Sequence, residues 1–299
     1  MLAIVVPYYK LTFFEETLKS LAIQTDKRFK VYIGDDASPE NPNDLLEKYN
    51  GKFEFDYHRF KDNLGGISLV QQWERCVSLS IDEEWLMILG DDDYLDSNVV
   101  ASFYNNFNDF NSKSNLVRYT SKLIYENLNT VSDLYKHPIW ETATDSFYRK
   151  FSKESRSSLS EHIFSKQSYL KYGFHNYPLA WNSDDRAWID FSDKRPIYTI
   201  NESIVYVRVS SFSITGKRDN LLKKNASEIE FYKFLISRKF KYYRDYQRIE
   251  IIKKYGKEIR RYRSLLIYEW LFISYYCVRY FDFDYLKKGF SMTINKLKS

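Results

Sequence analysis

Hydrophobic residues near the start of the chain fall into short runs separated by a segment with helical spacing. Residues 2–6 and 29–33 are apolar and rich in β-branched side chains, which predicts strands covered on both faces. Between them, apolar residues recur every three or four positions after Thr12, a candidate N-cap. Glu15 and Glu16 occupy the first turn, where the helix dipole favours acids. The pattern predicts a strand–helix–strand crossover unit.

The same alternation continues through residue 89. Phe53, Phe55 and Tyr57 alternate as in a strand, and residues 63–66 then turn the chain toward a helix. Residues 85–89 form another apolar run, which predicts a fourth strand. The first hundred residues therefore read as an open α/β sheet.

Acidic residues follow two of these predicted strands. Asp35 and Asp36 come after the second strand, and Asp91, Asp92 and Asp93 come after the fourth. In open α/β sheets, ligands bind at the edge where the strands end. Clustered carboxylates repel one another unless a cation neutralises them, and oxygen ligands favour Mg2+ or Mn2+. The competing interpretation is that these residues only cap solvated turns.

The second half of the chain offers another acidic pair. Asp184 and Asp185 precede a segment with a helical pattern, and Trp181 and Trp188 flank them. Paired carboxylates can supply a general base, and aromatic faces stack on sugars. Ordinary capping by Ser183, with acids in the first helical turn, explains the same residues without catalysis. A core role for the two tryptophans is equally compatible with the pattern.

Four short motifs, in this order, resemble those of the family 2 glycosyltransferases, which are inverting enzymes that use nucleotide sugars and have the GT-A fold. The motifs are Val5-Val6-Pro7-Tyr8-Tyr9, Gly34-Asp35-Asp36-Ala37-Ser38, Asn63-Leu64-Gly65-Gly66 and Leu89-Gly90-Asp91-Asp92-Asp93-Tyr94-Leu95. Each motif is weak alone, whereas four in the family's order and approximate spacing make a specific match. The resemblance covers about the first 100 residues.

The resemblance implies roles for these residues. It places the nucleotide against Pro7, Tyr8, Tyr9, Asp35, Asp36, Asn63, Gly65, Gly66 and Asp91. It also makes residues 91–93 the counterpart of the family's DxD element, with Asp92 as the ligand of Mn2+ or Mg2+ and Asp91 or Asp93 supporting it through water or ribose. Gly90 stands where relatives often carry a further acid, which makes Asp92 the best match for the metal-facing carboxylate.

Two further roles follow from the resemblance to the family. An acidic pair at a helix start usually carries the catalytic base, which corresponds here to Asp185, or to Asp184 if the register slips by one residue. Relatives often carry Arg-x-His in the strand and loop that close over the donor. Here Arg208 is followed by Ser210 in the His position, which suggests that Arg208, or Lys217 and Arg218 beyond it, steadies the diphosphate.

Charge divides the chain near residue 220. Residues 220–299 contain 19 Lys and Arg against 8 Asp and Glu, a balance of +11, while the whole chain carries +5 and residues 1–219 therefore −6. The basic segment has a helical pattern with interleaved aromatic residues. It is too short in apolar residues to cross a membrane, but it could lie on an anionic membrane surface. A solvated helical bundle explains the same pattern, and no nucleic-acid-binding module is recognisable.

These observations predict an α/β protein of GT-A type, with a Rossmann-like mixed sheet flanked by helices and a helical basic C-terminal segment. We expect a catalytic domain over residues 1–219, divided into a nucleotide-sugar half (1–110) and an acceptor half (111–219), and a helical segment over 220–299. Two cysteines and four scattered histidines indicate neither a disulfide framework nor a zinc site. The N-terminus leads straight into a strand without a leader pattern, so we expect a cytoplasmic protein.

The predicted activity is inverting transfer of a sugar from a nucleotide-diphosphate sugar, most simply a UDP-sugar, to a hydroxyl of a glycan or lipid-linked acceptor in bacterial surface polysaccharide synthesis. The alternative is a non-catalytic, nucleotide-sugar-binding or scaffolding member of an assembly complex, which Gly90 and Ser210 would fit. A nucleotidyltransferase is disfavoured because no basic glycine-rich loop is present at the N-terminus.

Overall fold

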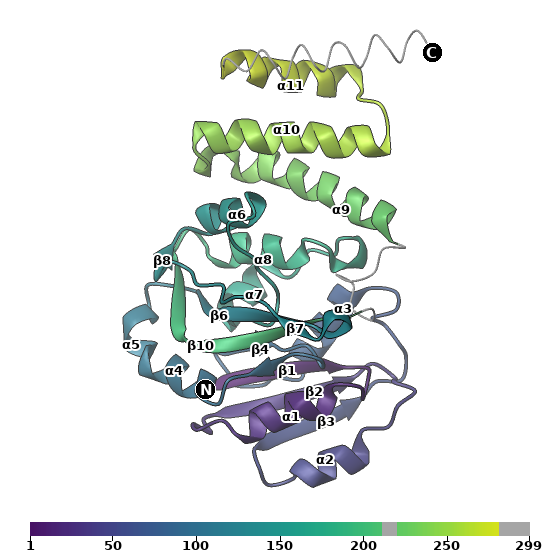
Figure 1. Ribbon diagram of the computed structural model, residues 1–299, viewed down its shortest axis with the longest axis vertical. Coiled ribbons are helices and arrows are strands. Elements are labelled where there is room, and N and C mark those ends of the chain that lie inside the picture. Colours follow the sequence, from purple (N-terminus) through teal and green to yellow (C-terminus); the bar gives the residue numbers. More distant parts are fainter. Residues whose placement is uncertain (211–219, 281–299) are drawn as a thin grey trace. The chain divides into compact units, whose positions relative to one another are not determined.

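The apolar runs at the start of the chain form the centre of a large sheet in the computed structural model, which describes residues 1–210 and 220–280. The chain divides into two units, residues 1–218 and residues 219–299. The sheet belongs to the first unit, and the second contains helices α9 to α11 among its described residues (Figure 1).

The described residues of the first unit form one ten-stranded mixed sheet. Its strands are β1 (Leu2–Tyr8), β2 (Phe29–Asp35), β3 (Glu54–Arg59), β4 (Trp85–Ile88), β5 (Tyr94–Leu95), β6 (Leu116–Tyr125), β7 (Thr130–Val131), β8 (Trp140–Glu141), β9 (His162–Ser165) and β10 (Ile197–Val209). The main order is β3-β2-β1-β4-β9-β6-β10-β5, while β7 pairs with β6 and β8 with β10.

Strand direction explains where the acidic residues gather. Strands β3, β2, β1 and β4 are parallel neighbours, so their carboxyl ends lie at one edge of the sheet. Asp35 ends β2, and the Gly90 turn follows β4 along the same edge. Next to β4 the direction reverses, because β9 runs antiparallel to both β4 and β6. The prediction that acidic residues line one sheet edge is thus confirmed.

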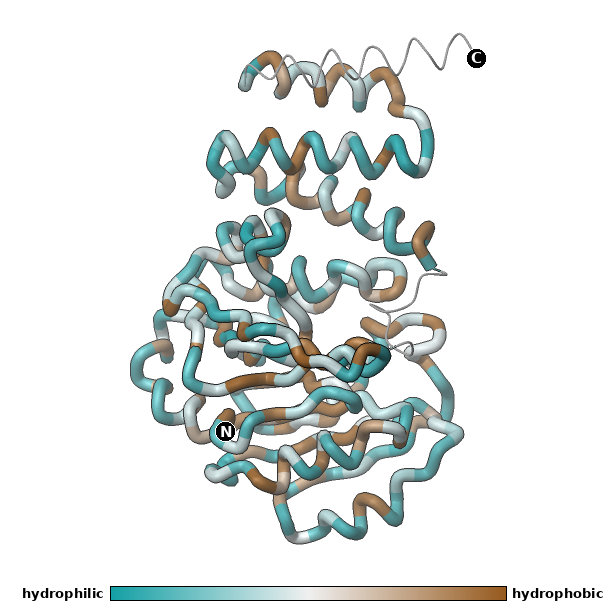
Figure 2. The backbone as a smooth tube through the Cα atoms, viewed as in Figure 1, coloured by the Kyte–Doolittle hydropathy of each residue, from teal (hydrophilic) through white to brown (hydrophobic). Residues whose placement is uncertain are grey.

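Helices cover both faces of the sheet (Figure 1). They are α1 (Phe14–Ala22), α2 (Asn43–Tyr49), α3 (Leu69–Val77), α4 (Val99–Asn105), α5 (Phe107–Phe110), α6 (Ala143–Phe151), α7 (Lys166–Tyr172) and α8 (Ser183–Phe191), with single 3-10 turns at Glu126–Leu128 and Pro178–Ala180. Residues of α1, α2, α4 and α5 share one apolar core with β1 and β2. Figure 2 shows hydrophobic positions concentrated along the central strands. On the other face, aromatic residues of α3 and α8 pack around Phe164 and Phe174.

The local sequence patterns predicted some ends of helices and strands incorrectly. Thr12 is not an N-cap, because α1 begins at Phe14 after Phe13 and no side chain caps it. Strand β1 also continues through Pro7 to Tyr8 instead of ending before it. Helix α3 begins at Leu69, after the turn predicted at residues 63–66, and is capped by Ser68, whose hydroxyl accepts a hydrogen bond from the Gln71 amide.

Close packing between β2 and α3 involves one of the two cysteines. Cys76 is fully buried, and its sulfur lies only 2.3 Å from where a Cβ would stand on Gly34. A side chain at position 34 would therefore displace the helix. Burial raises the pKa of the Cys76 thiol well above its ordinary value.

The second unit consists of helices α9 (Leu221–Phe234), α10 (Asp245–Tyr262) and α11 (Ile267–Arg279), with a π-helical turn (Leu235–Lys239) and a 3-10 turn (Phe240–Tyr242) after α9. Ile249 and Ile252 of α10 pack against Ile273 and Cys277 of α11 in a small apolar core. Within residues 1–210 and 220–280, no helix has the length and apolar character needed to span a membrane.

Candidate active site

The turn after β4 carries three consecutive carboxylates. The Leu89 amide still pairs with β1, through the Val5 carbonyl at 2.9 Å, and the chain then turns back so that the Asp93 amide donates to the Gly90 carbonyl at 3.2 Å. A Cβ on Gly90 would lie 3.0 Å from oxygens of both Asp92 and Asp93. Glycine at this position therefore leaves space for the carboxylates to fold over the turn.

The outer carboxylates of this turn are held by protein donors. One oxygen of Asp91 accepts hydrogen bonds from the backbone amides of Tyr9 at 2.8 Å and Lys10 at 2.9 Å, which ties the turn to the end of β1. Asp93 is buried. Its Oδ1 accepts from the Arg208 amide at 2.8 Å, and its Oδ2 accepts from the hydroxyl of Ser160. Both side chains thus have fixed positions.

Asp92 differs from its neighbours. Among residues 1–210 and 220–280, no other residue donates a hydrogen bond to its carboxylate, which is only partly buried. Burial and then the charge of Asp91 raise the pKa of Asp92 to about 6. Burial and then the charge of Asp92 raise the pKa of Asp93 to about 7, and burial raises that of Asp91 to about 6. Such a cluster favours a bound cation, and Asp92 has the oxygens open to one.

Arg208 points back at the turn. Its side chain is 3% exposed, its Nε donates to the Asp92 carbonyl at 2.9 Å, and its guanidinium pairs with Glu16 at 2.7 Å and with Glu126. The ring of Phe13 lies 4.0 Å below the guanidinium carbon. These contacts tie β10 to the turn, and the role of Arg208 at a diphosphate stays a prediction. Ser210 lies buried just past β10, whereas Lys217 and Arg218 fall outside the described residues.

The acidic residues at the end of β2 are also fully engaged. Both oxygens of Asp35 accept hydrogen bonds: Oδ1 from the Ser38 amide at 2.7 Å, and Oδ2 from the Tyr57 hydroxyl at 2.6 Å and Arg59 at 2.7 Å. Asp35 is fully buried. The Ser38 contact is the turn-capping interaction that a solvated or structural interpretation expects. A role against the nucleotide base stays a prediction for this residue.

The position of the Asp36 side chain explains why glycine is needed at position 65 of the Asn63-Leu64-Gly65-Gly66 motif. Its carboxylate accepts from the amides of Leu64 at 2.8 Å and Gly65 at 2.9 Å and pairs with Arg75. A Cβ on Gly65 would stand 2.5 Å from the Asp36 Oδ2 atom. A Cβ on Gly66 would stand 2.6 Å from the Asn63 side-chain oxygen. In the structure these close approaches are to protein side chains.

The end of β1 presents its two tyrosines differently. Tyr8 is fully buried and its hydroxyl donates to the Glu40 carbonyl at 2.8 Å, whereas Tyr9 is 36% exposed. The Tyr9 carbonyl accepts from the Ser38 hydroxyl at 2.6 Å. The structure thus brings Pro7, Tyr8 and Tyr9 to the same sheet edge as the acidic residues. Of the two tyrosines, Tyr9 has the side chain that a ligand could reach.

The acidic pair lies in the first turn of α8, after Asn182 in a left-handed conformation (φ 66°). Ser183 is the first helical residue and not the cap. Asp185 is buried, and its two oxygens accept from Lys150 at 2.6 Å and from the Asn182 side chain at 2.9 Å. Burial alone would lower the pKa of Lys150, but the charges of Asp185 and Asp184 outweigh it and raise that pKa.

Asp184 is the open member of the pair. No side chain donates a hydrogen bond to it within the described part of the chain, and it is only partly buried. Burial, followed by the charge of Asp185, raises the pKa of Asp184 to about 6. Trp188 is buried and stacks on His162 with ring centroids 4.2 Å apart, which gives it a core role. Trp181 is only partly buried.

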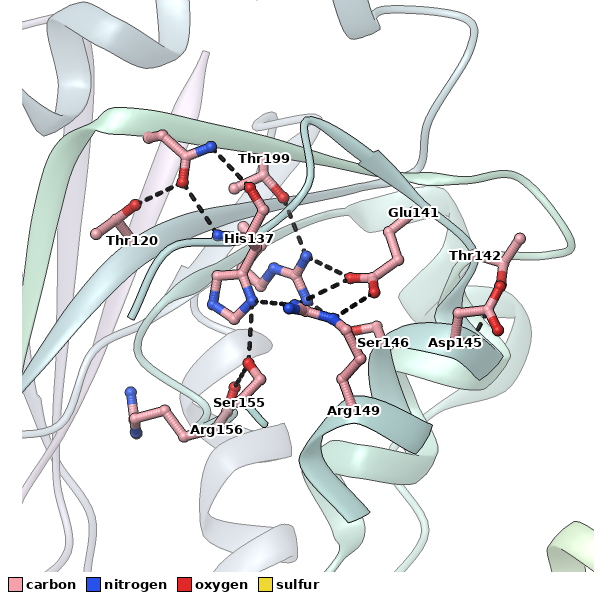
Figure 3. Close-up of polar contacts among 12 residues, drawn as sticks. Thr120, His137, Glu141, Thr142, Asp145, Ser146, Arg149, Ser155, Arg156 and Thr199 are labelled. Carbon is pink, nitrogen blue, oxygen red and sulfur yellow. Dashed lines mark hydrogen bonds and ion pairs between the residues drawn. The ribbon is translucent and has the colours of Figure 1, made fainter. Parts of the chain in front are cut away.

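A polar network joins Arg118 of β6, Glu141 of β8 and Arg149 of α6. The Glu141 carboxylate accepts hydrogen bonds from the guanidinium groups of Arg118 at 2.9 Å and Arg149 at 2.6 Å. Figure 3 shows Arg149 and His137 beside Glu141. The His137 ring contacts Arg149 at 2.8 Å and Ser155 at 3.2 Å. Because Arg149 can only donate, the His137 Nδ1 atom accepts this bond. Burial, with Arg118 next, lowers the pKa of His137 to about 2, so the ring is neutral.

Three residues of this site lack any sequence signal. Ser160 lies in a serine-rich stretch without a motif, yet it binds Asp93, 67 positions away. Lys150 binds Asp185, 35 positions away, and Glu16 binds Arg208, 192 positions away. Each pairing depends on how the strands are ordered in the sheet.

The fold is similar to that of solved glycosyltransferases. S. aureus TarS 1–349 in complex with UDP-GlcNAc matches with a TM-score of 0.66 and 15% identity, over 86% of this chain and 72% of that chain. The mannosyltransferase PcManGT from Pyrobaculum calidifontis, in complex with GDP-Man and Mn2+, matches with a TM-score of 0.54 and 11% identity, over 79% and 64%. GalNAc-T7 with UDP, GalNAc and Mn2+ matches with a TM-score of 0.52 and 13% identity, over 86% and 54%. The fold is therefore that of the GT-A glycosyltransferases.

The sequence defines the family more closely. The sequence model of glycosyl transferase family 2 matches residues 3–168, more than half of the chain, and the chain therefore belongs to this family. No curated protein matches the sequence closely enough to be significant. The matched region includes the turn with Asp92 and ends before Asp184 and Asp185. The predicted family and fold class are both confirmed.

Proposed function

We propose that this protein is a metal-dependent, inverting glycosyltransferase that uses a nucleotide-diphosphate sugar. The observation that carries the proposal is the turn after β4, in which protein donors hold Asp91 and Asp93 while the carboxylate of Asp92 stays open. Membership of glycosyl transferase family 2 supplies the reaction class. TarS with UDP-GlcNAc and PcManGT with GDP-Man support a nucleotide-sugar donor.

The residues present fit a metal ion that is shared with the donor. The described residues contain no group of three or more His, Cys, Asp or Glu side chains arranged to hold a metal. Mg2+ and Mn2+ at such sites use one or two carboxylates and take further ligands from substrate phosphates and water. Asp92 would be the protein ligand, with Asp93 behind it. When bound, the ion would neutralise charge on the departing nucleoside diphosphate.

The acidic pair of α8 supplies the base in this proposal. One carboxylate takes the proton of the acceptor hydroxyl, the hydroxyl oxygen bonds to the anomeric carbon, and the bond from that carbon to the diphosphate oxygen breaks, with inversion. The family pattern favours Asp185 for this step. The environment favours Asp184, because its carboxylate is open and its pKa is raised to about 6, whereas Asp185 is bound to Lys150.

A UDP-sugar is the proposed donor, and the proposed acceptor is a glycan or lipid-linked hydroxyl of a bacterial surface polysaccharide. UDP is present in two of the three compared structures, TarS and GalNAc-T7. An α-linked UDP-sugar would give a β-linked product under inversion. The acceptor class rests on the resemblance to the family.

Helix α11 supports contact with a membrane surface that carries such an acceptor. Tyr268, Leu271, Tyr275 and Val278 of this helix are each more than half exposed. The acid of this helix, Glu269, is buried and paired with Arg263, so α11 presents no exposed carboxylate. An exposed aromatic and apolar helix face on a basic segment suits an anionic lipid surface. Flotation with vesicles containing phosphatidylserine tests this contact, with phosphatidylcholine vesicles and the variant Leu271→Glu as controls.

Thermal unfolding with UDP, GDP, dTDP and CMP, each with and without Mn2+, tests the central proposal. We expect one diphosphate to raise the unfolding temperature only when Mn2+ is present, since each completes the ligand set of the other. Asp92→Ala should abolish the Mn2+-dependent part of the shift. The same shift in wild type and in Asp92→Ala would contradict the assignment.

A further inference from the structure

One side chain from the acceptor half supports the turn that carries Asp92. Ser160 is 3% exposed, and its hydroxyl both donates to the Asp93 Oδ2 atom and accepts from the Gly90 amide at 3.1 Å. These two contacts are at opposite ends of the four-residue turn. A single hydroxyl therefore closes the turn from one side, while Arg208 holds the other Asp93 oxygen.

The loop that carries Ser160 is itself firmly anchored. Glu161 is fully buried, pairs with Arg156, and accepts from the Ser158 amide and hydroxyl at 3.2 Å each. The Glu161 carbonyl accepts from the Tyr119 amide of β6 at 2.9 Å. Arg156 also donates to the Ser121 hydroxyl of β6 at 2.6 Å. The loop is thus fixed to a neighbouring strand and provides a rigid support.

The other end of the loop joins the polar network of Figure 3. Ser155 contacts the His137 ring, which in turn accepts from Arg149. The charge of Arg156 acts on Asp93 at one side and on Lys150, the partner of Asp185, at the other. The loop over residues 155–161 therefore connects the turn at residues 90–93, called the metal turn below, with Lys150, which binds Asp185 of the acidic pair.

We propose that Ser160 is a positioning residue that sets the metal affinity of Asp92 through Asp93. This inference rests on the proposed function, because it presumes that Asp92 binds the metal. Without the hydroxyl, the Asp93 Oδ2 atom and the Gly90 amide lose their partner in a buried place, and the turn relaxes to regain hydrogen bonds. Residues behind metal ligands typically change metal affinity by about 10-fold to 100-fold when removed.

Mn2+ binding to the full chain in the presence of UDP, measured by the electron paramagnetic resonance signal of free Mn2+, tests the proposal. GDP replaces UDP if GDP is the diphosphate that stabilises the protein. Ser160→Ala should weaken Mn2+ binding about 10-fold or more. Ser160→Thr, which keeps the hydroxyl, should restore most of the affinity.

Ser158→Ala is the matched control. It removes a hydroxyl from the same loop, but that hydroxyl contacts Glu161 and not the metal turn. We expect wild-type Mn2+ affinity in this variant. Equal weakening in Ser158→Ala and Ser160→Ala would overturn the inference, because the effect would then belong to the loop in general.

The two proposals fail in different ways. Mn2+ binding by wild type and by Ser160→Ala with equal affinity overturns the role of Ser160 alone. Absence of Mn2+ binding in wild type overturns the proposed function, and the inference falls with it. If Ser160→Ala does not fold, Ser160→Cys keeps the side-chain volume with only a weak donor and should show the same loss of affinity.

Discussion

The two carboxylate clusters of the first unit are held by different kinds of hydrogen-bond donor. In the turn after β4, backbone amides and a hydroxyl hold Asp91 and Asp93, and the middle residue stays open. At the start of α8, a lysine holds Asp185, and Asp184 stays open. Hydrogen-bond donors without charge leave the net negative charge of a cluster in place, whereas Lys150 cancels one charge of its pair.

This difference suits two kinds of chemistry. A cluster that keeps its negative charge attracts a cation, as a metal site needs. A pair whose charge is reduced by a neighbouring lysine does not compete for that cation and can keep one carboxylate for proton transfer. The raised pKa of each open carboxylate, about 6 for both Asp92 and Asp184, shows that each remains incompletely compensated.

The largest expected effect comes from the open carboxylate of the turn. Asp92→Ala should lower transfer about 1000-fold or more, because several kcal/mol of charge stabilisation depend on the metal. Its unfolding temperature should equal or exceed that of wild type at pH 7, since no other described residue donates a hydrogen bond to this carboxylate and its pKa, raised to about 6, makes its charge unfavourable to the fold. Asp93→Ala should instead lower the unfolding temperature, because Ser160 and Arg208 lose their acceptor. Steady-state transfer and calorimetry of both variants measure the contrast, and a reversed pattern would contradict the division of roles.

The acidic pair should show the next largest effect. Whichever of Asp184→Asn and Asp185→Asn removes the base should lower kcat about 100-fold or more while the donor binds normally. Asp185→Asn also leaves the half-buried Lys150 without its hydrogen-bonded carboxylate, which destabilises the fold. The double variant Lys150→Met with Asp185→Asn should regain that stability, which separates the loss of fold from the loss of catalysis. Near-wild-type kcat in both single variants would remove the pair from the mechanism.

The pH dependence of the free energy of unfolding tests whether the pKa of Asp184 is raised in the folded protein. Its pKa is raised from 3.8 in the ordinary state to about 6 in the folded protein, so the folded state binds the proton more tightly than the unfolded chain. The cost of ionising it is absent below about pH 4 and complete above about pH 6. Asp184→Asn should therefore raise the free energy of unfolding by about 1–3 kcal/mol at pH 7, with the gain lost as the pH falls toward 4. Urea unfolding at a series of pH values measures this, and a gain independent of pH would contradict it.

A smaller effect, on stability alone, is expected from replacing Gly65, which lies against the Asp36 carboxylate. Gly65→Ala should cost about 1–2 kcal/mol, because its Cβ meets an Asp36 oxygen that Arg75 and backbone amides hold in place. Gly66→Ala should cost less, about 1 kcal/mol or below, because its Cβ meets the side-chain oxygen of Asn63, which accepts an exposed hydrogen bond from the Gly66 amide rather than a buried ion pair. Denaturant midpoints of the two variants compare these costs, and equal values would show that Asp36 moves as freely as Asn63.

The sequence was sufficient for strands β1 to β4 and their acidic edge, because strand and helix periods are local properties. Residues 29–33 and 85–89 needed only their own pattern to predict β2 and β4, and the parallel arrangement then brought Asp35 and Asp91 to one edge. The partners of the carboxylates were not predictable. Ser160, Lys150 and Glu16 come from distant segments, and no periodicity links them to the acids that they contact.

The placement of the tyrosines shows a second limit. Tyr8 and Tyr9 are adjacent and chemically alike, yet Tyr8, the last residue of β1, is fully buried, whereas Tyr9, just past the strand, is exposed. Which tyrosine is covered depends on α1, whose Phe14 packs on Tyr8 with ring centroids 4.6 Å apart. The motif alone therefore could not tell which tyrosine a ligand could reach.

The two cysteines give each unit its own chemical reporter. Cys76 lies between β2 and α3 of the first unit and Cys277 lies in the core between α10 and α11; neither forms a disulfide, and both are fully buried. A thiol reagent can reach either one only when the surrounding helix moves away. Labelling rates at Cys76 and Cys277, followed separately by mass spectrometry, would therefore time the opening of the two units within one unmodified chain.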